Sequence, residues 1–200
     1  MLTPRERASV SELEFASPVL IDPLAAPDGG LTLADAGSTT KILVRAGSDT
    51  AAATALAVPY GQSRQGDDGI LICGSRPDEW TLYAPAGQSA QVTASVPTNG
   101  FVTVIDLTHG RAMIRMSGSS SVSALAKVCN IDLADDMVPA GAVFSAAVAG
   151  VSCDLVRDDR DGQRSYLLSC ERSFGRYLFV ALADAGIEFG IDVPEGWTLH

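Results

Sequence analysis

The chain has 200 residues, of which 46% are hydrophobic and 19% charged, and its formal net charge is −10. This length and composition predict one domain, or two small ones that share a core, with enough buried surface to need no metal or disulfide. The acidic balance and the scarcity of clustered lysine and arginine exclude nucleic acid and anionic membrane surfaces as expected partners.

Residues 1–38 are predicted to form an extended N-terminal arm. Prolines recur through the segment and Gly29-Gly30 follows them, a composition that prevents a core helix. Its apolar residues would be exposed if the arm hung in water, so we expect it to dock on this protein or on a partner, near Trp80 or Trp197. We also expect the rest of the chain to fold without residues 1–30. The apolar residues of the arm include Leu13, Phe15, Val19, Leu20, Ile21 and Leu24.

Residues 39–98 predict the first of two similar α+β halves. Gly47 ends a strand there, and the Ser48-Asp49 pair that follows is typical of residues that cap a helix by accepting from its first N–H groups. The expected elements, in chain order, are a strand at 41–45, a helix reaching Ala57, a hairpin with strands at 69–73 and 79–84, and a weaker helix at 87–96.

Residues 99–200 predict a second half that repeats the first. A strand at 101–105 precedes the repeat, and Gly118 then takes the place of Gly47, 71 residues later in the chain. The expected elements are a strand at 111–116, a helix reaching about Val128, a hairpin with strands at 151–156 and 165–170, and a helix from Phe174 to Ala185. That helix has one apolar stripe, formed by Phe174, Tyr177, Leu178, Ala181, Leu182 and Ala185.

Strand, helix, hairpin and helix therefore follow one another twice. Most strands that are adjacent in the sequence are expected to pair as hairpins, and the helices have one apolar stripe each. This pattern predicts an α+β fold, one compact domain of two similar halves in which helices pack on mixed or antiparallel sheets.

His109 lies between Asp106 and Arg111 and is the one histidine away from the C-terminus. A general base is one interpretation of this residue. Because no nucleophile stands nearby in the sequence, we favour a hairpin loop between two apolar strands, in which Gly110 supplies a positive φ.

Three other polar stretches each have a binding and a structural interpretation. The run Ser117–Ser121 fits a phosphate site or a helix cap, and it lacks the lysine and spacing of nucleotide-binding loops, which favours the cap. Arg111 and Arg115 share one strand face, which is an anion or partner site or, as we favour, a solvated outer face with acidic cross-strand partners. The loop Asp158–Gly162 lacks the closing glutamate of a calcium site, so we interpret it as a hairpin turn.

Trp80 and Trp197 each follow a turn that contains an acid, and each suits either core packing or an interface anchor. The cysteines form no CxxC pair, which argues against a zinc site and predicts free, buried thiols in a reduced, cytoplasmic protein. No segment has the length and composition of a membrane span or a targeting signal. The cysteines are Cys73, Cys129, Cys153 and Cys170.

A series of short motifs follows a set order at residues 106–112, 114–118, 125–127, 129–133, 139–141, 166–168 and 171–178. The run Arg76-Pro77-Asp78-Glu79-Trp80-Thr81-Leu82 precedes them. Their order and spacing resemble the gamma subunit of heterotetrameric sarcosine oxidase, a family that is itself similar to the folate-binding domains of the glycine-cleavage aminomethyltransferases. The resemblance covers about residues 41–186 and departs from the family pattern at Thr81, where the gamma subunits have leucine.

The resemblance implies a fold like the aminomethyltransferase folate-binding domain and a non-catalytic subunit that serves assembly, packed against a large subunit. The complex it implies demethylates sarcosine oxidatively to glycine, with alpha, beta and delta subunits as partners and FAD, FMN, NAD and tetrahydrofolate on those subunits. No catalytic, cofactor-binding or metal-binding residue is expected on this chain.

Two alternatives stay open: a gamma-like subunit of a related multisubunit amine demethylase, and a free-standing, folate-binding protein like the aminomethyltransferases. Folate-dependent aminomethyltransferases have an Asn-Ala or Asn-Ser pair after the strand that matches 166–168. This chain has Ser169-Cys170-Glu171-Arg172 at that place, which argues against a polar contact to a pterin.

Overall fold

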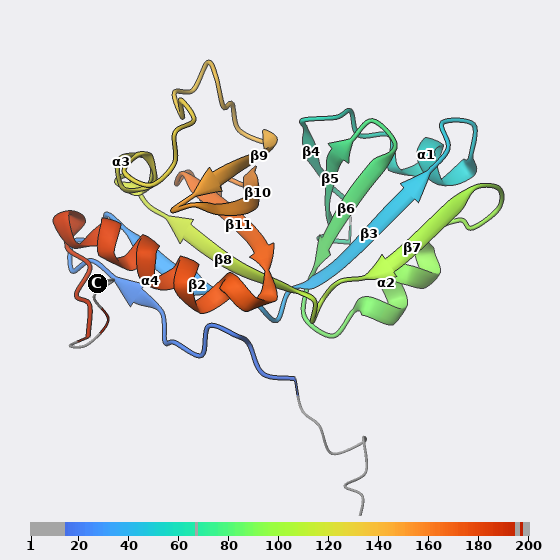
Figure 1. The fold of residues 1–200 in the computed structure, drawn as a ribbon. Helices are drawn as coiled ribbons and strands as arrows, with labels where there is room; N and C mark the ends of the chain where they lie inside the picture. Colours follow the sequence, from blue (N-terminus) through green and yellow to red (C-terminus); the bar gives the residue numbers. More distant parts are fainter. Residues whose placement is uncertain (1–14, 67, 195–196, 198–200) are drawn as a thin grey trace, which may run out of the picture.

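Two antiparallel β-sheets form the centre of the molecule, and helices pack against the outer face of each (Figure 1). The structure is a computed structural model, and it describes residues 15–66, 68–194 and 197. All pairs of strands in these two sheets are antiparallel. The predicted α+β fold class is therefore confirmed.

The first sheet has the strand order β4-β5-β6-β3-β7. Helices α1 (Ala51–Leu56) and α2 (Ser89–Ser95) contribute apolar side chains that pack against Ile42 and Val44 on its outer face. The strands are β3 (Thr40–Ala46), β4 (Ser63–Gln65), β5 (Leu71–Arg76), β6 (Glu79–Ala84) and β7 (Val102–Asp106).

The second sheet has the order β1-β2-β8-β11-β10-β9. Its outer face packs against α3 (Ser121–Ala126) and α4 (Gly175–Gly186), and this contact holds the largest apolar core. The strands are β1 (Leu24–Ala25), β2 (Thr32–Asp35), β8 (Arg111–Ser117), β9 (Val143–Val148), β10 (Val151–Arg157) and β11 (Ser165–Glu171). Two short 3-10 helices, η2 (Arg172–Phe174) and η3 (Ile187–Phe189), flank α4.

The internal duplication predicted from the sequence is visible in the order of the strands. The order β5-β6-β3-β7 in the first sheet corresponds to β10-β11-β8-β2 in the second. In each half the first strand, β3 or β8, is followed by a glycine and a helix. The hairpin that comes later, β5–β6 or β10–β11, then pairs with that first strand through β6 or β11. A helix then follows the hairpin in both halves.

The inner faces of the two sheets pack against each other through a third apolar cluster. Leu71, Cys73 and Tyr83 of the first sheet contact Met113 and Leu167 of the second. On β8 the neighbours of Met113 point the opposite way, into the helix-covered core, because side chains alternate along a strand. The layers are therefore helices, sheet, sheet and helices.

The predicted N-terminal arm differs most from the structure. The part of it that the structure describes supplies β1 and β2, and β2 pairs with β8 from Thr32 to Asp35. Val19 and Leu33 have no exposed surface, so the segment is a component of the second core. The prolines prevent a helix but leave room for two short strands. This packing does not support the expectation that the chain folds without residues 1–30, and Leu13 lies outside the described residues.

The strand that was expected to open the second half pairs with the first sheet instead, with Ile105 opposite Leu43. The turn at His109 therefore connects two different sheets, and the predicted hairpin between the flanking strands is wrong. The positive φ predicted for Gly110 is also wrong. Local pattern locates a strand, but the partner of a strand depends on contacts that are distant in the sequence. The predicted caps also differ, because Thr50 caps α1 through its side chain and Ser120, which precedes α3, does not.

Candidate functional site

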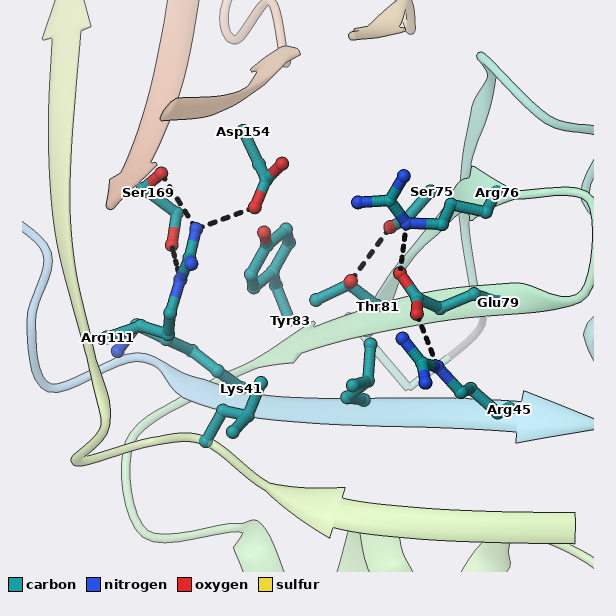
Figure 2. A pocket seen from close by; sticks show the side chains of 12 residues that line it. Lys41, Arg45, Ser75, Arg76, Glu79, Thr81, Tyr83, Arg111, Asp154 and Ser169 are labelled. Carbon is teal, nitrogen blue, oxygen red and sulfur yellow. Dashed lines mark hydrogen bonds and ion pairs between the residues drawn. The ribbon is translucent and has the colours of Figure 1, made fainter. Parts of the chain in front are cut away.

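A cavity of about 170 Å³ lies where the two sheets diverge, between β3, β5 and β6 of one and β8, β10 and β11 of the other (Figure 2). We call it the inter-sheet cavity. Four basic side chains and two acidic ones line it, in a chain whose net charge is −10. They are Lys41, Arg45, Arg76, Arg111, Glu79 and Asp154.

Arg111 forms one end of the inter-sheet cavity, as Figure 2 shows. Its Nη2 lies 2.6 Å from Asp154 Oδ2, and its Nε donates to Ser169 Oγ at 3.3 Å. Its Nη1 lies 3.1 Å from the exposed carboxylate of Glu171. Arg111 therefore bridges β8 to its neighbour β11 and to β10 beyond it.

The strand face that holds Arg111 and Arg115 faces the first sheet, so the predicted solvated outer face is wrong. Both side chains are only about one fifth exposed, at 20% and 21%. The predicted acidic cross-strand partners are present, since Arg115 Nη2 lies 2.8 Å from Asp158 Oδ2. Met113 stands between the two arginines on the same face, and its burial marks this face as an inner one.

Glu79 forms the other end of the inter-sheet cavity and holds two arginines (Figure 2). Arg45 Nε lies 2.6 Å from Glu79 Oε2, and Arg76 Nε lies 3.3 Å from Glu79 Oε1. The glutamate side chain is 8% exposed, whereas the two arginine side chains are 59% and 64% exposed. A buried carboxylate thus positions two guanidinium groups at the mouth of the cavity.

Lys41 is 1% exposed, and its ammonium group is held by backbone oxygens. Nζ donates to the carbonyl oxygens of Gly37 and Thr39 at 2.8 Å and to that of Thr108 at 3.2 Å. Burial lowers the pKa of Lys41 to about 8, and the nearby carboxylates of Asp35 and Asp106 oppose this shift. Through these three hydrogen bonds Lys41 links the end of the N-terminal segment to the turn that connects the sheets.

The polar groups around the inter-sheet cavity are therefore paired largely with one another. Ser75 Oγ and Thr81 Oγ1 also form a hydrogen bond, at 2.8 Å, and burial raises the pKa of the Tyr83 phenol. Such an arrangement holds charges in place and suits the docking of a polar group better than proton transfer. Among the residues that the structure describes, no three His, Cys, Asp or Glu side chains gather as a metal site.

His109 lies outside the inter-sheet cavity, in the turn that joins β7 to β8. Its ring stacks on that of Phe15, with the centroids 4.5 Å apart and the planes 12° from parallel. Its carbonyl oxygen accepts from Arg172 Nη1 at 3.2 Å. Phe15 and His109 line a separate hollow of about 340 Å³ beside the N-terminal segment.

The other polar stretches have structural surroundings. Asp158 pairs with Arg115 and Arg160, and Asp159 pairs with Arg157, so two of the three carboxylates of the predicted turn are engaged in ion pairs. The run Ser117–Ser121 leads from the end of β8 to the start of α3, and the Ser121 hydroxyl is buried with no hydrogen-bond partner among the described residues.

The two tryptophans differ in their surroundings. Trp80 is 6% exposed and its Nε1 donates to the carbonyl oxygen of Val58 at 2.9 Å, so it belongs to the core of the first sheet. Trp197 is half-buried against the second core, and the guanidinium of Arg176 lies 6.0 Å from its ring.

Residue-level reasoning missed Lys41 and Glu79, which organise the two ends of the site. Arg45 lies 34 residues from its partner Glu79, and Thr108, whose carbonyl oxygen accepts from Lys41, lies 67 residues away, so no local pattern predicts these two contacts. For Arg111 and Arg115 a signal existed, because Met113 between them is apolar.

Comparison with known proteins identifies the family. The model of the sarcosine oxidase gamma subunit family matches residues 45–188. The fold is similar to that of a heterotetrameric sarcosine oxidase from Corynebacterium sp. U-96, solved in complex with pyrrole 2-carboxylate. The TM-score is 0.71 at 22% identity, over 86% of this chain and 91% of that one.

A second structure with a similar fold is the glycine cleavage system aminomethyltransferase T from Bartonella henselae. The TM-score is 0.61 at 17% identity, over 75% of this chain and 44% of that one.

Comparison with curated proteins gives no match. Within residues 15–66, 68–194 and 197, each helix is too short or too polar to cross a bilayer. The family match covers well over half of the chain, so the chain belongs to the sarcosine oxidase gamma subunit family.

Proposed function

We propose that this chain is the non-catalytic gamma subunit of a flavin-dependent, heterotetrameric sarcosine oxidase, which demethylates sarcosine oxidatively to glycine. The observation that carries the proposal is the family match over residues 45–188, which covers most of both halves of the duplicated fold. The chain serves assembly by packing against a large, alpha-type subunit, with beta and delta subunits in the same complex in the cytoplasm.

A patch of apolar side chains supports a packing role. We define the N-terminal patch as Phe15, Leu20, Phe174 and Tyr177, which are 68%, 70%, 49% and 44% exposed. These residues lie on two segments in contact, because Arg172 Nη2 donates to the carbonyl oxygen of Ala16 at 2.6 Å. Phe174 and Tyr177 were predicted on the apolar stripe of a helix at 174–185, yet they are half-exposed. Aromatic and aliphatic surface of this kind is typical of interfaces.

Leu20 adds an argument from the backbone. Its φ is +49°, in the left-handed region that costs a residue other than glycine about 1–2 kcal/mol. The same residue exposes 70% of its surface, so the isolated chain has both a strained backbone and an apolar side chain in water. A partner that covers Leu20 would remove the second of these two costs.

The cofactors of the complex, FAD, FMN, NAD and tetrahydrofolate, belong in this proposal on the other subunits. The inter-sheet cavity, at about 170 Å³, is smaller than the roughly 300–1,000 Å³ typical of pockets for such ligands. The polar groups that line it are also engaged with one another, so a cofactor would have to displace existing ion pairs.

The alternative of a free-standing, folate-binding protein has one observation in its favour, the fold that this chain has in common with aminomethyltransferase T. Against it stand the surroundings of Ser169 and Cys170, which replace the asparagine pair of the folate-dependent enzymes. Ser169 Oγ accepts from Arg111, and Cys170 is buried in the helix-covered core of the second sheet. A gamma-like subunit of a related amine demethylase differs from the main proposal only in the substrate of the partner subunits.

Turnover by the assembled complex tests whether the chain is catalytic. The chain is co-expressed with the alpha, beta and delta subunits, and sarcosine-dependent oxygen uptake is measured per purified complex. Because His109 stacks on Phe15 in a turn, we expect His109→Ala to change kcat by much less than tenfold, or about 1.4 kcal/mol. A larger loss in a complex of unchanged composition would assign His109 a part in catalysis and contradict the proposal.

A further inference from the structure

We propose that the free edge of the first sheet, strand β7, binds an extended segment of a different subunit, which adds a strand to that sheet. The inference rests on the proposed function, because it names a contact through which the chain joins the larger subunits. The surface shares no residue with the N-terminal patch, and its Ile105 pairs with Leu43, which lines the inter-sheet cavity.

The backbone of β7 has hydrogen-bonding groups that point away from the sheet. Leu107 N donates to Lys41 O at 2.8 Å and Gly47 N donates to Phe101 O at 3.0 Å, so the odd-numbered residues of this segment bond to β3. In an antiparallel pair the residues between them turn their N–H and C=O groups to the other side. Val104 and Asp106 therefore present outward N–H groups, and β7 is the last strand of its sheet.

The edge strands β4 and β9 are each contacted by another part of the chain. Ser63 N at the start of β4 donates to Gly141 O at 2.7 Å, and Val143 N at the start of β9 donates to Gly61 O at 2.9 Å. The edge strands β4 and β9 of the two sheets thus cover each other where they begin. The remaining edge strand, β1, has two residues. Among the described residues, β7 therefore pairs along one side only, whereas the six-residue edge strand β9 is contacted at both ends, by Gly61 and by Cys129.

The side chains of β7 are unusual for an edge that stays in water. Phe101, just before the strand, is 83% exposed, and Ile105 is 42% exposed on the same face. Native sheets protect free edges with lysine, proline, bulges or short strands. The five residues of β7, VTVID, contain no lysine or proline, and they pair with β3 without a register shift.

Charge argues for a different chain as the occupant. Two copies of this chain would each carry a formal charge of −10 and would repel each other. Asp106 is exposed at the end of β7, so a partner strand gains from a basic residue opposite it. The segment that fits is extended, with apolar residues beside Phe101 and Ile105 and a lysine or arginine beside Asp106.

Ile105→Lys tests the edge, with Ile131→Lys as the matched control. The two isoleucines are 42% and 37% exposed, and Ile131 lies in the loop after α3, far along the chain from the first sheet. Each variant is co-expressed with the alpha, beta and delta subunits, and the complex is quantified by size-exclusion chromatography. We expect Ile105→Lys to reduce the recovered complex at least tenfold and Ile131→Lys to leave it unchanged, while both isolated chains unfold like the parent chain.

Hydrogen exchange gives an independent measurement on the unmodified chain. Amides in residues 101–107 are followed by mass spectrometry in the isolated chain and in the complex. We expect the outward N–H groups of Val104 and Asp106 to exchange at least tenfold more slowly in the complex. Protection of these amides in the isolated chain, together with a dimer mass, would overturn the choice of a different subunit.

The two proposals fail in different ways. If the unmodified chain forms no complex with the other subunits, the proposed function fails. If it assembles, but Ile105→Lys assembles equally well and residues 101–107 exchange as in the isolated chain, the β7 proposal is overturned and the proposed function stands.

Discussion

Lys41 is a buried cation whose ammonium group is bonded to three carbonyl oxygens between the N-terminal segment and the turn that joins the sheets. Its burial makes the charged form costly, which is why its pKa falls from 10.5 to about 8. The same bonds would lose their donor if the residue were apolar. The contribution of Lys41 to the free energy of unfolding therefore depends on pH.

The free energy of unfolding should rise with pH as Lys41 loses its proton. Between about pH 8 and 10.5 the unfolded chain binds this proton more tightly than the folded chain, so increasing pH favours the folded state. Urea unfolding of the parent chain and of Lys41→Met across this range isolates the effect, because other groups cancel in the difference. We expect the stability of the parent chain relative to Lys41→Met to increase with pH, and a decrease would contradict the account.

Gly118 permits the close approach of the N-terminal segment to the start of α3. Its φ is +115°, and a Cβ placed there would lie 2.3 Å from the carbonyl oxygen of Gly30. Gly118→Ala should lower the free energy of unfolding by more than about 3 kcal/mol, because it combines backbone strain with a backbone clash. Gly150→Ala is the control, since Gly150 also has a positive φ but nothing within 4 Å, and should cost about 1 kcal/mol. Equal costs for the two variants in urea unfolding would refute this role.

Individual elements follow closely from local sequence pattern. The strand predicted at 41–45 is Thr40–Ala46, and the hairpin predicted at 151–156 and 165–170 is β10 and β11. These segments alternate or run apolar over a few residues, which specifies a strand without reference to a partner. The pairing of 102–106 with β3 has no such signal, because it depends on the length and path of the chain around α2.

The candidate site was predictable only in part for the same reason. The period of two along β8 places Arg111 and Arg115 on one face. Which face points inward depends on the first sheet, whose contribution at that point is Leu71, Cys73 and Tyr83. The burial of Glu79 depends on its ion pair with Arg45. These two residues lie opposite each other because of the register between β3 and β6, which the sequence alone does not predict.

A substitution in the N-terminal patch can distinguish an effect on folding from an effect on assembly. Leu20→Asn introduces a residue that tolerates the left-handed backbone, and it removes the exposed apolar side chain at this position. We expect the isolated chain to be equally stable or more stable by up to about 1 kcal/mol, and the complex with the alpha-type subunit to be recovered at least tenfold less. Thermal unfolding and co-purification measure the two effects.

Ala57→Asn is the matched control for Leu20→Asn. Ala57 is also exposed with a positive φ, of +42°, at the end of α1, and no residue of the N-terminal patch lies on that helix. It should relieve the same strain and leave assembly unchanged. Assembly of the Leu20→Asn chain at the parent level would remove the patch from the proposed interface.

The whole molecule combines a duplicated fold with surfaces that the chain alone leaves open. The charged side chains of the inter-sheet cavity pair with one another, and apolar residues gather on the N-terminal patch and along β7. This distribution suits a subunit whose role is to assemble. We expect the purified chain to be colourless, because the proposal places every flavin on the partner subunits.

Native mass spectrometry of the co-expressed subunits tests this account most directly. The measurement gives the composition of the complex, and the mass of each chain released from it. The account predicts that this chain occurs in one complex with alpha, beta and delta subunits, and that it leaves the complex with the mass of the bare polypeptide. A chain that stays outside the complex formed by the other three, or that retains the mass of a flavin or a folate, would contradict it.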